Sequence, residues 1–198
     1  MIDPVTFYRI EQYRLREAYV FSDKTISIDL SKFESGESNI LLIAGLPASG
    51  KTTLGMKLAK KYNATIFKTD ECLNEGKGLN NKVFKDAETC YRDSFISAKK
   101  SAKRYVMEGV LVYWSCIKLD NKGLTPFFNQ QKDAPVIILG TSVIKTFWQG
   151  WQRDKDEESL RDIYKWYIKN NIKDNKVLNI YKQARGNVPD VDIKEYKF

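Results

Sequence analysis

Residues 45–52 read Gly-Leu-Pro-Ala-Ser-Gly-Lys-Thr, and this stretch decides the fold of the chain. It fits the phosphate-binding pattern G-x-x-x-x-G-K-[ST], the P-loop, at every fixed position. Residues 39–44 before it form a short apolar run that is typical of a strand. Residues 53–62 after it place four side chains on one helical face: Leu54, Leu58, Ala59 and Tyr62. A loop between a strand and a helix is the context in which this motif binds nucleotides.

The loop has the chemistry of a triphosphate site. Gly45 and Gly50 allow a tight path with backbone N–H groups pointing inward, and the following helix adds the positive end of its dipole. Lys51 would reach the β- and γ-phosphates, and Thr52 would offer a hydroxyl to Mg²⁺. The predicted ATP-binding residues of this region are Gly45, Ala48, Ser49, Gly50, Lys51, Thr52 and Thr53. The alternative is a glycine-rich turn that binds nothing.

Length and composition indicate one domain that spans residues 1–198. Hydrophobic residues make up 42% of the chain and charged residues 29%, as in globular proteins. The apolar runs are far shorter than the roughly 20 residues of a membrane helix. The N-terminus lacks the basic-then-apolar order of a signal peptide. We therefore expect no membrane association and a cytoplasmic location.

The absence of histidine narrows the chemistry. It excludes catalytic triads with histidine and histidine-ligated metals. A general base must then be a carboxylate or, less commonly, Lys, Tyr or Cys, and Mg²⁺ must be held by oxygen ligands. The cysteines are three in number, widely spaced and without C-x-x-C: Cys72, Cys90 and Cys116. This spacing indicates reduced, partly buried thiols rather than a zinc site or a disulfide framework.

Two acids lie at the ends of further predicted strands. Asp70 follows the predicted strand 64–67, and Glu108 lies near the end of the predicted strand 105–110. Open α/β sheets bind ligands at the carboxyl ends of their parallel strands. Asp70 is the predicted general base, with a helix N-cap as the alternative. Glu108 is predicted to bind Mg²⁺ or its water, with a purely structural acid as the alternative.

Helices are predicted between and after these strands. Residues 84–104 carry a core-facing stripe at helical spacing: Phe84, Ala87, Tyr91, Phe95, Ala98 and Ala102. An apolar strand is predicted at 135–140. Residues 142–170 predict a helical lid over the phosphates and the helix that follows it. Arg153 is the predicted transition-state cation, with Arg161 as a second phosphate contact; a surface ion pair with a neighbouring aspartate is the alternative for Arg153.

The first 38 residues form an extension before the nucleotide-binding unit. They predict a helix up to Tyr19, a strand over 24–30 and a loop over 31–38. Packing on the sheet is one interpretation of this extension, and a flap over the acceptor is the other. The whole chain therefore predicts an α/β fold. It would be a three-layer sandwich of the P-loop NTPase type, with a mostly parallel sheet of four or five strands and a helical lid.

The sequence resembles the small P-loop kinases, and within them the predicted kinases related to the kinase domain of phage polynucleotide kinase. Three segments within residues 40–167 carry the resemblance: 45–54, 68–71 (Lys-Thr-Asp-Glu) and 148–165. The resemblance implies that Asp70 deprotonates an acceptor hydroxyl. The Glu108-Gly109 pair resembles the Asp-Gly that ends a sheet strand in nucleoside monophosphate kinases.

The expected activity is transfer of the γ-phosphoryl group of ATP, with Mg²⁺, to a hydroxyl. The net charge of +8 favours a polyanionic partner such as nucleic acid. The resemblance implies a 5′-hydroxyl end or, as in similar phage enzymes of DNA modification, a hydroxymethylated pyrimidine base. This sequence departs from the polynucleotide kinases at two positions, because Gln149 and Leu73 replace arginines of that family. Both departures argue against a standard polynucleotide 5′-hydroxyl acceptor. A small-molecule or nucleoside monophosphate kinase and a non-catalytic ATP-binding switch are the alternatives, and the switch would need no acceptor base.

Overall fold

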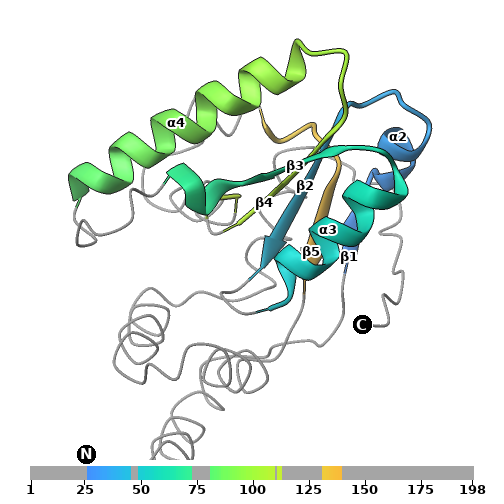
Figure 1. The fold of residues 1–198 in the computed structure, drawn as a ribbon, viewed down its shortest axis with the longest axis horizontal. Coiled ribbons are helices and arrows are strands. Elements are labelled where there is room, and N and C mark those ends of the chain that lie inside the picture. Colours follow the sequence, from blue (N-terminus) through green and yellow to red (C-terminus); the bar gives the residue numbers. More distant parts are fainter. Residues whose placement is uncertain (1–25, 46–48, 73–80, 110, 113–130, 140–198) are drawn as a thin grey trace, which may run out of the picture.

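The structure is a computed structural model that describes residues 26–45, 49–72, 81–109, 111–112 and 131–139. Within them five strands form one sheet: β1 Ile26–Ile28, β2 Ile40–Gly45, β3 Thr65–Lys68, β4 Tyr105–Glu108 and β5 Val136–Leu139. The helices are α2 Leu30–Glu34, α3 Lys51–Lys61 and α4 Asn81–Lys99, with a 3₁₀ turn η1 at Thr69–Cys72. Figure 1 shows the strands between α3 and α4.

The sheet has the strand order β1-β5-β2-β4-β3, with β2 at its centre. β2 runs parallel to both of its neighbours, and β3 runs parallel to β4. β1 is antiparallel to β5 and forms one edge. The predicted α/β fold with a mostly parallel sheet is confirmed.

The order of the strands places α3 and α4 on opposite faces of the sheet. The connection through α3 leads outward from β2 to β3, and the connection through α4 leads back from β3 to β4. Since parallel crossovers are right-handed, a change of direction along the sheet moves the helix to the other face. This is the layered arrangement in Figure 1.

β2 is buried along its whole length because both faces of the sheet are covered. On the α3 face, Leu41 and Ile43 of β2 join a core cluster with side chains of α2, α3, β4 and β5. The helical members of this cluster are Leu30, Phe33, Leu54, Leu58 and Ala59. The predicted apolar face of the helix after the P-loop is thus confirmed.

α4 carries the predicted apolar stripe but begins three residues earlier and ends five residues earlier than predicted. Four members of the stripe are buried: Ala87, Tyr91, Phe95 and Ala98. Ala102 lies beyond the helix and is exposed. The helix ends early because Asn39 Nδ2 donates to the carbonyls of Ala98 and Ser101, both at 2.7 Å, and of Lys103 at 3.3 Å.

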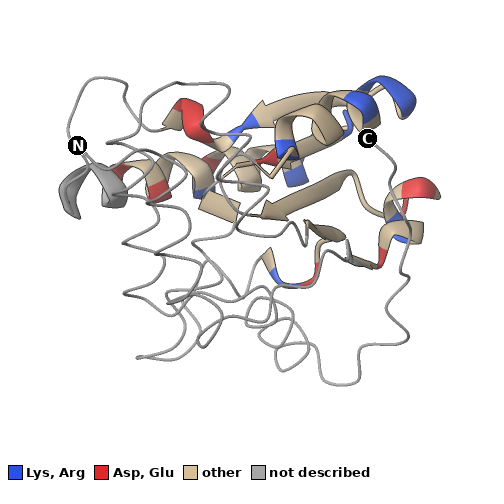
Figure 2. Ribbon diagram, turned by 90° about the horizontal axis from the view of Figure 1, so that it is seen from below, with Lys and Arg blue, Asp and Glu red and all other residues tan. Residues whose placement is uncertain are grey.

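Basic side chains gather where α3 and α4 end. Both helices return the chain to the amino edge of the sheet, where Thr65 N–H donates to the Arg104 carbonyl and Tyr105 N–H donates to the Asn39 carbonyl, both at 2.8 Å. The exposed lysines at this edge are Lys60, Lys61, Lys99, Lys100 and Lys103. Figure 2 shows blue ribbon at the ends of both helices. Cations at a helix C-terminus complement the helix dipole.

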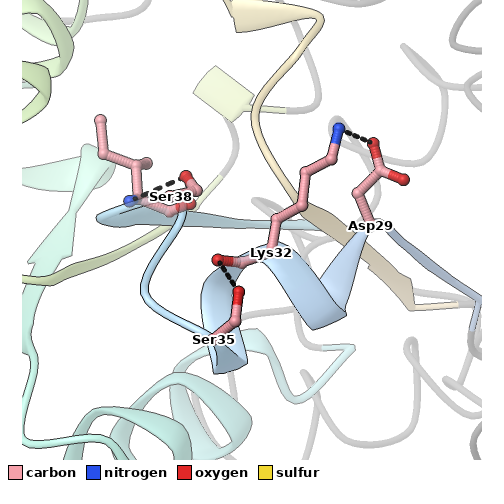
Figure 3. A network of polar contacts seen from close by, with 5 residues as sticks. Asp29, Lys32, Ser35 and Ser38 are labelled. Carbon is pink, nitrogen blue, oxygen red and sulfur yellow. Dashed lines mark hydrogen bonds and ion pairs between the residues drawn. The ribbon is translucent and has the colours of Figure 1, made fainter.

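The segment before β2 differs from its prediction. Among the described residues the strand covers Ile26–Ile28, and the short helix α2 is formed by Leu30, predicted as the end of the strand, and by residues 31–34, predicted as loop. Asp29 adopts a left-handed conformation (φ 54°) that ends the strand. Leu30 and Phe33, three residues apart, are both buried, so α2 is fixed by packing. Figure 3 shows the polar contacts around it, including the ion pair of Lys32 Nζ with Asp29 Oδ2 at 3.3 Å.

The prediction of reduced cysteines is wrong for two of the three. Cys72 of η1 and Cys90 of α4 form a disulfide, with their Cα atoms 5.7 Å apart. The two residues are separated by 18 positions, and only the packing of η1 against α4 brings them together. Cys116 lies outside the described residues.

Candidate active site

The carboxyl ends of β2, β3 and β4 lie at one edge of the sheet because these strands run parallel. In the register, Glu108 of β4 lies between Ile43 of β2 and Lys68 of β3. α3 begins at the same edge with Lys51. The fold therefore brings the P-loop lysine and the two predicted acids, Glu108 and Asp70, to one edge.

The two P-loop glycines are favoured for different reasons, limited space at Gly45 and the backbone conformation at Gly50. A Cβ atom on Gly45 would lie 2.8 Å from Ser49 Oγ and 3.1 Å from Leu139 Cβ, which is too close for packed atoms. Gly50, the N-cap of α3, has a φ of 92°, a conformation that side chains with a Cβ rarely adopt. Glycine is therefore favoured at both ends of the segment that joins β2 to α3. Ala48 lies outside the described residues.

The first turn of α3 offers a positive end to an anion. Lys51 is its first residue and is 7% exposed, so its charge is held close to the protein. Thr52 and Thr53 follow it and are exposed. This turn contains no acidic side chain. Backbone N–H groups, the helix dipole and the lysine therefore act in the same direction on a phosphate group.

Thr52 and Glu108, the two predicted Mg²⁺ ligands, are in direct contact. Thr52 Oγ1 donates a hydrogen bond to Glu108 Oε1 at 2.8 Å. They lie 56 positions apart in the chain and on different elements. Glu108 is 2% exposed, although it is the last residue of its strand. The structure thus joins a hydroxyl and a carboxylate at the start of α3.

Burial raises the pKa of the Glu108 carboxyl above its ordinary value, and the charge of Asp70 acts in the same direction. The hydrogen bond from Thr52 opposes this change, as do the charges of Lys51 and Lys68. Burial thus leaves the charge of Glu108 only partly compensated by Thr52, Lys51 and Lys68.

Gly55 allows α3 to approach this carboxylate closely. A Cβ on Gly55 would lie 3.2 Å from Ile66 Cδ1 and 3.4 Å from Glu108 Cγ. Ile66 and Glu108 therefore both point toward α3. The pattern of the helix did not single out Gly55, because a glycine in a helix is informative only once its neighbours are known.

Asp70 lies in η1, directly after β3, and its side chain is exposed. Gly109 packs against this turn with a φ of 136°. A Cβ on Gly109 would collide with Thr69 Oγ1 and lie 3.0 Å from Asp70 Oδ1. Leu111 N–H donates to Thr69 Oγ1 at 3.3 Å. Asp70 is thus placed beside Glu108-Gly109, the segment that ends β4.

Lys68 is a site residue that the sequence analysis did not single out as a contact of its own. It lies two positions after Ile66 and therefore on the same face of the sheet, toward α3. Its strand partner is Glu108, and its positive charge lowers the pKa of that carboxyl. The contact of Lys68 with Glu108 could be predicted only from the register of β3 with β4, since a lysine at the end of a strand is common.

The rest of the predicted site falls outside the described residues. This applies to Arg153, to Arg161 and to the whole predicted lid, 142–170. Among the residues that the structure describes, no group of three or more Cys, Asp or Glu side chains is arranged to hold a metal ion. In the same part of the chain, no helix is long and apolar enough to cross a membrane.

No protein-family model matches the sequence, and no curated protein matches it. Among solved structures, the chain is similar to shikimate kinase from Acinetobacter baumannii in complex with shikimate. The identity is 18%, the TM-score is 0.46, and the match covers 78% of this chain and 83% of the kinase.

Deoxyadenosine kinase from M. mycoides is also similar. With the products dCMP and dCDP bound it has 18% identity, a TM-score of 0.47 and coverage of 76% of this chain and 87% of the kinase. With dATP bound it has 19% identity, a TM-score of 0.44 and coverage of 75% and 87%. At this level of similarity, the substrates of these enzymes say nothing about the acceptor of this chain.

Proposed function

We propose that this chain is an ATP-dependent kinase that transfers the γ-phosphoryl group to a hydroxyl. The observation that carries the proposal is the contact of Thr52 Oγ1 with the buried Glu108 at the start of α3, with Asp70 at the same edge of the sheet. A nucleotide-binding loop alone would need only the helix terminus and Lys51. An added pair of acids, one buried and one exposed, supports a reaction rather than binding alone.

ATP would bind with its phosphates at the first turn of α3. Gly45 and Gly50 set the path of the loop, and Lys51 would contact the β- and γ-phosphates. The loop residues Ala48 and Ser49 and the exposed Thr53 complete the proposed ATP site. Arg161, outside the described residues, is proposed as a further phosphate contact.

The donor set at Thr52 and Glu108 fits Mg²⁺. Both groups offer oxygen atoms, and their oxygens lie 2.8 Å apart. Mg²⁺ is commonly held by one or two protein oxygens together with water and substrate phosphates. A magnesium ion bound there would offset the negative charge of the phosphates during transfer. The residues of the chain would hold it directly through Thr52 and directly or through water at Glu108.

Asp70 would accept the proton of the acceptor hydroxyl. Its exposed carboxylate is accessible to a substrate at the carboxyl edge, and Gly109 and Thr69 fix the turn that carries it. In phosphoryl transfer, positioning and charge stabilisation do most of the catalysis, and the base orients the nucleophile. Arg153 is proposed as the cation that stabilises the transferred group.

For the acceptor we favour a small molecule with a free hydroxyl over a nucleic acid. The exposed lysines at the ends of α3 and α4 lie at the amino edge, whereas α3 begins with Lys51 at the carboxyl edge. Their charge therefore does not favour a polyanion at the carboxyl edge. Helix-dipole complementation explains their position without any ligand. A nucleic-acid acceptor and a nucleoside monophosphate remain the other outcomes of the test.

The test is phosphate transfer from γ-labelled ATP with Mg²⁺ to a panel of acceptors. The panel contains nucleosides and hydroxylated small molecules, nucleoside monophosphates, 5′-hydroxyl DNA and RNA, and DNA with hydroxymethylated pyrimidines. We expect label on a small molecule. Lys51→Ala should abolish it. Lys60→Ala, which removes an exposed lysine from the other end of α3, should leave it unchanged.

Label on a polynucleotide would establish the nucleic-acid reading and reject a small acceptor. Bound ATP without transfer to any acceptor would favour a nucleotide-dependent switch over a kinase. Full transfer by Lys51→Ala would contradict the assignment of the P-loop.

A further inference from the structure

The disulfide joins the turn that carries Asp70 to α4. Cys72 is the last residue of η1 and is 7% exposed. Cys90, in the middle of α4, is exposed. The Cα separation of 5.7 Å is the usual one for a disulfide. Cys72 is therefore buried, whereas Cys90 is exposed to solvent.

η1 is held at both of its ends. At its start, Thr69 is fully buried and accepts the hydrogen bond from Leu111 N–H. At its end, Cys72 is bonded to α4. Asp70 lies between these two attachments and is itself exposed. When the bond to Cys90 breaks, the covalent attachment of the turn is lost, and the hydrogen bond at Thr69, the packing of Gly109 and the packing of η1 against α4 remain.

We propose that the Cys72–Cys90 pair is a thiol-exchange site whose oxidation state sets how firmly the Asp70 turn is held. The disulfide form holds the turn, and the dithiol form loosens it. The consequence for phosphoryl transfer rests on the function proposed above. Lys51, Thr52 and Glu108 belong to α3 and β4 and not to η1, so we expect the affinity for ATP to be the same in both forms.

The exchange involves a dithiol reductant of low molecular weight. A thiolate of the reductant attacks Sγ of Cys90, the S–S bond breaks, and Cys72 leaves as a thiolate that takes up a proton. The second thiol of the reductant then attacks the mixed disulfide and releases Cys90 as a thiol. Two electrons pass from the reductant to the protein, and the reductant ends as its own disulfide. Exposure of Cys90 makes it the sulfur that is attacked.

The experiment compares the full chain after treatment with oxidised glutathione and after treatment with dithiothreitol. Titration of thiols should give one per chain in the oxidised form and three in the reduced form, because two of the three cysteines form the disulfide. Amide hydrogen exchange at residues 69–72 should become at least about tenfold faster on reduction, as expected for a local opening. Exchange in β2 and β4 should stay the same.

Transfer from γ-labelled ATP should fall about tenfold or more on reduction, since small misplacements of a catalytic group have effects of this size. The Kd for ATP should be unchanged. Cys72→Ser and Cys90→Ser should behave as the reduced form under both treatments. Cys116→Ser should keep the difference between them.

Three thiols after oxidation, or equal exchange at 69–72 in the two forms, would overturn the proposal. Equal transfer rates in the two forms would also overturn it. If neither form transferred phosphate, the function proposed above would be wrong, while the exchange measurement would still decide whether the disulfide holds the turn.

Discussion

Glu108 is a carboxylate at a position that the fold buries. Its pKa is raised mainly because burial disfavours the charged form, and the hydrogen bond from Thr52 only opposes this effect. Without a bound cation, the ionised side chain therefore reduces the stability of the native state. A protein tolerates such a group where function requires it.

We expect Glu108→Gln to raise the free energy of unfolding at pH 7 by about 1 kcal/mol, a common gain when a functional charge is removed. A carboxyl with a raised folded-state pKa stabilises the protein fully below its unfolded pKa. That stability is lost as the pH rises through the folded pKa. The advantage of the variant should therefore shrink as the pH falls toward about 4. Urea unfolding of both proteins between pH 4 and pH 7, in EDTA and without nucleotide, measures this difference in the free energy of unfolding.

Glu37→Gln is the matched control, because it removes an exposed carboxylate from the loop before β2. It should leave the stability unchanged to within about 0.5 kcal/mol. A loss of stability in Glu108→Gln at pH 7 would show that burial does not penalise this charge. The same variant should lose the Mg²⁺ dependence of ATP binding.

At the scale of residues, the sequence predicted what is local. Gly45, Gly50, Lys51 and Thr52 follow one another within eight positions, so their spacing alone indicated their chemistry. The roles of Gly55 and Lys68 depend on which strands become neighbours and in which register. The composition and periodicity of a single segment do not show which strands become its neighbours or in which register they pair.

Among the elements, η1 is held in place by a glycine of another segment. We expect Gly109→Ala to destabilise the protein by roughly 1–3 kcal/mol, since Gly109 has a φ of 136° and no room for a side chain. It should also displace the Asp70 turn, so transfer should fall at least about tenfold while ATP affinity is kept. Thermal unfolding and transfer assays measure the two effects.

Gly36→Ala is the matched control for Gly109→Ala, because it strains the backbone without displacing the turn that carries Asp70. Gly36 has a φ of 84°, but a Cβ there would meet nothing within 4 Å. This variant should lose stability and keep its rate of transfer. If Gly109→Ala retained full transfer despite its lost stability, Gly109 would have no part in positioning Asp70.

The end of α4 depends on one amide side chain. Asn39→Ala removes the donor of three carbonyls and should destabilise the protein by about 1–3 kcal/mol without changing transfer, because Asn39 precedes β2 at the amino edge. Asn39→Asp, which keeps the shape and replaces the donor by an acceptor, should be at least as damaging. Equal stability of Asn39→Asp and the parent chain in urea would contradict this account.

The differences between predicted and observed elements follow from contacts that are distant in sequence. From the periodicity we predicted that helix α4 extends to residue 104, whereas the contacts of Asn39 end it at Lys99. Leu30 was predicted to end the preceding strand, and residues 31–34 were predicted as loop because the segment is rich in Ser, Gly and Glu. The burial of Leu30 and Phe33 makes this segment helical. The disulfide was not predicted because its cysteines are 18 positions apart and lie on different elements.

The molecule as a whole separates stability from chemistry at two edges of one sheet. At the amino edge, the Arg104 guanidinium lies 4.3 Å from the ring centroid of Phe33 and 5.3 Å from that of Tyr62. Arg104 also donates to the Phe33 carbonyl, which fixes α2 against the start of β4. At the carboxyl edge, Thr52, Glu108 and Asp70 come together. Substitutions at the first edge should therefore change stability and leave activity unchanged, whereas those at the second should change activity, whether or not stability also changes.

The measurement that tests the account most directly is transfer from γ-labelled ATP by the Asp70→Asn variant, with its affinity for ATP measured in parallel. A general base contributes about 10²–10⁴-fold to a rate. We predict unchanged ATP affinity and transfer at least about 100-fold slower than in the parent chain. Transfer at the rate of the parent chain would contradict the central claim that the acids at this edge make the nucleotide site a kinase.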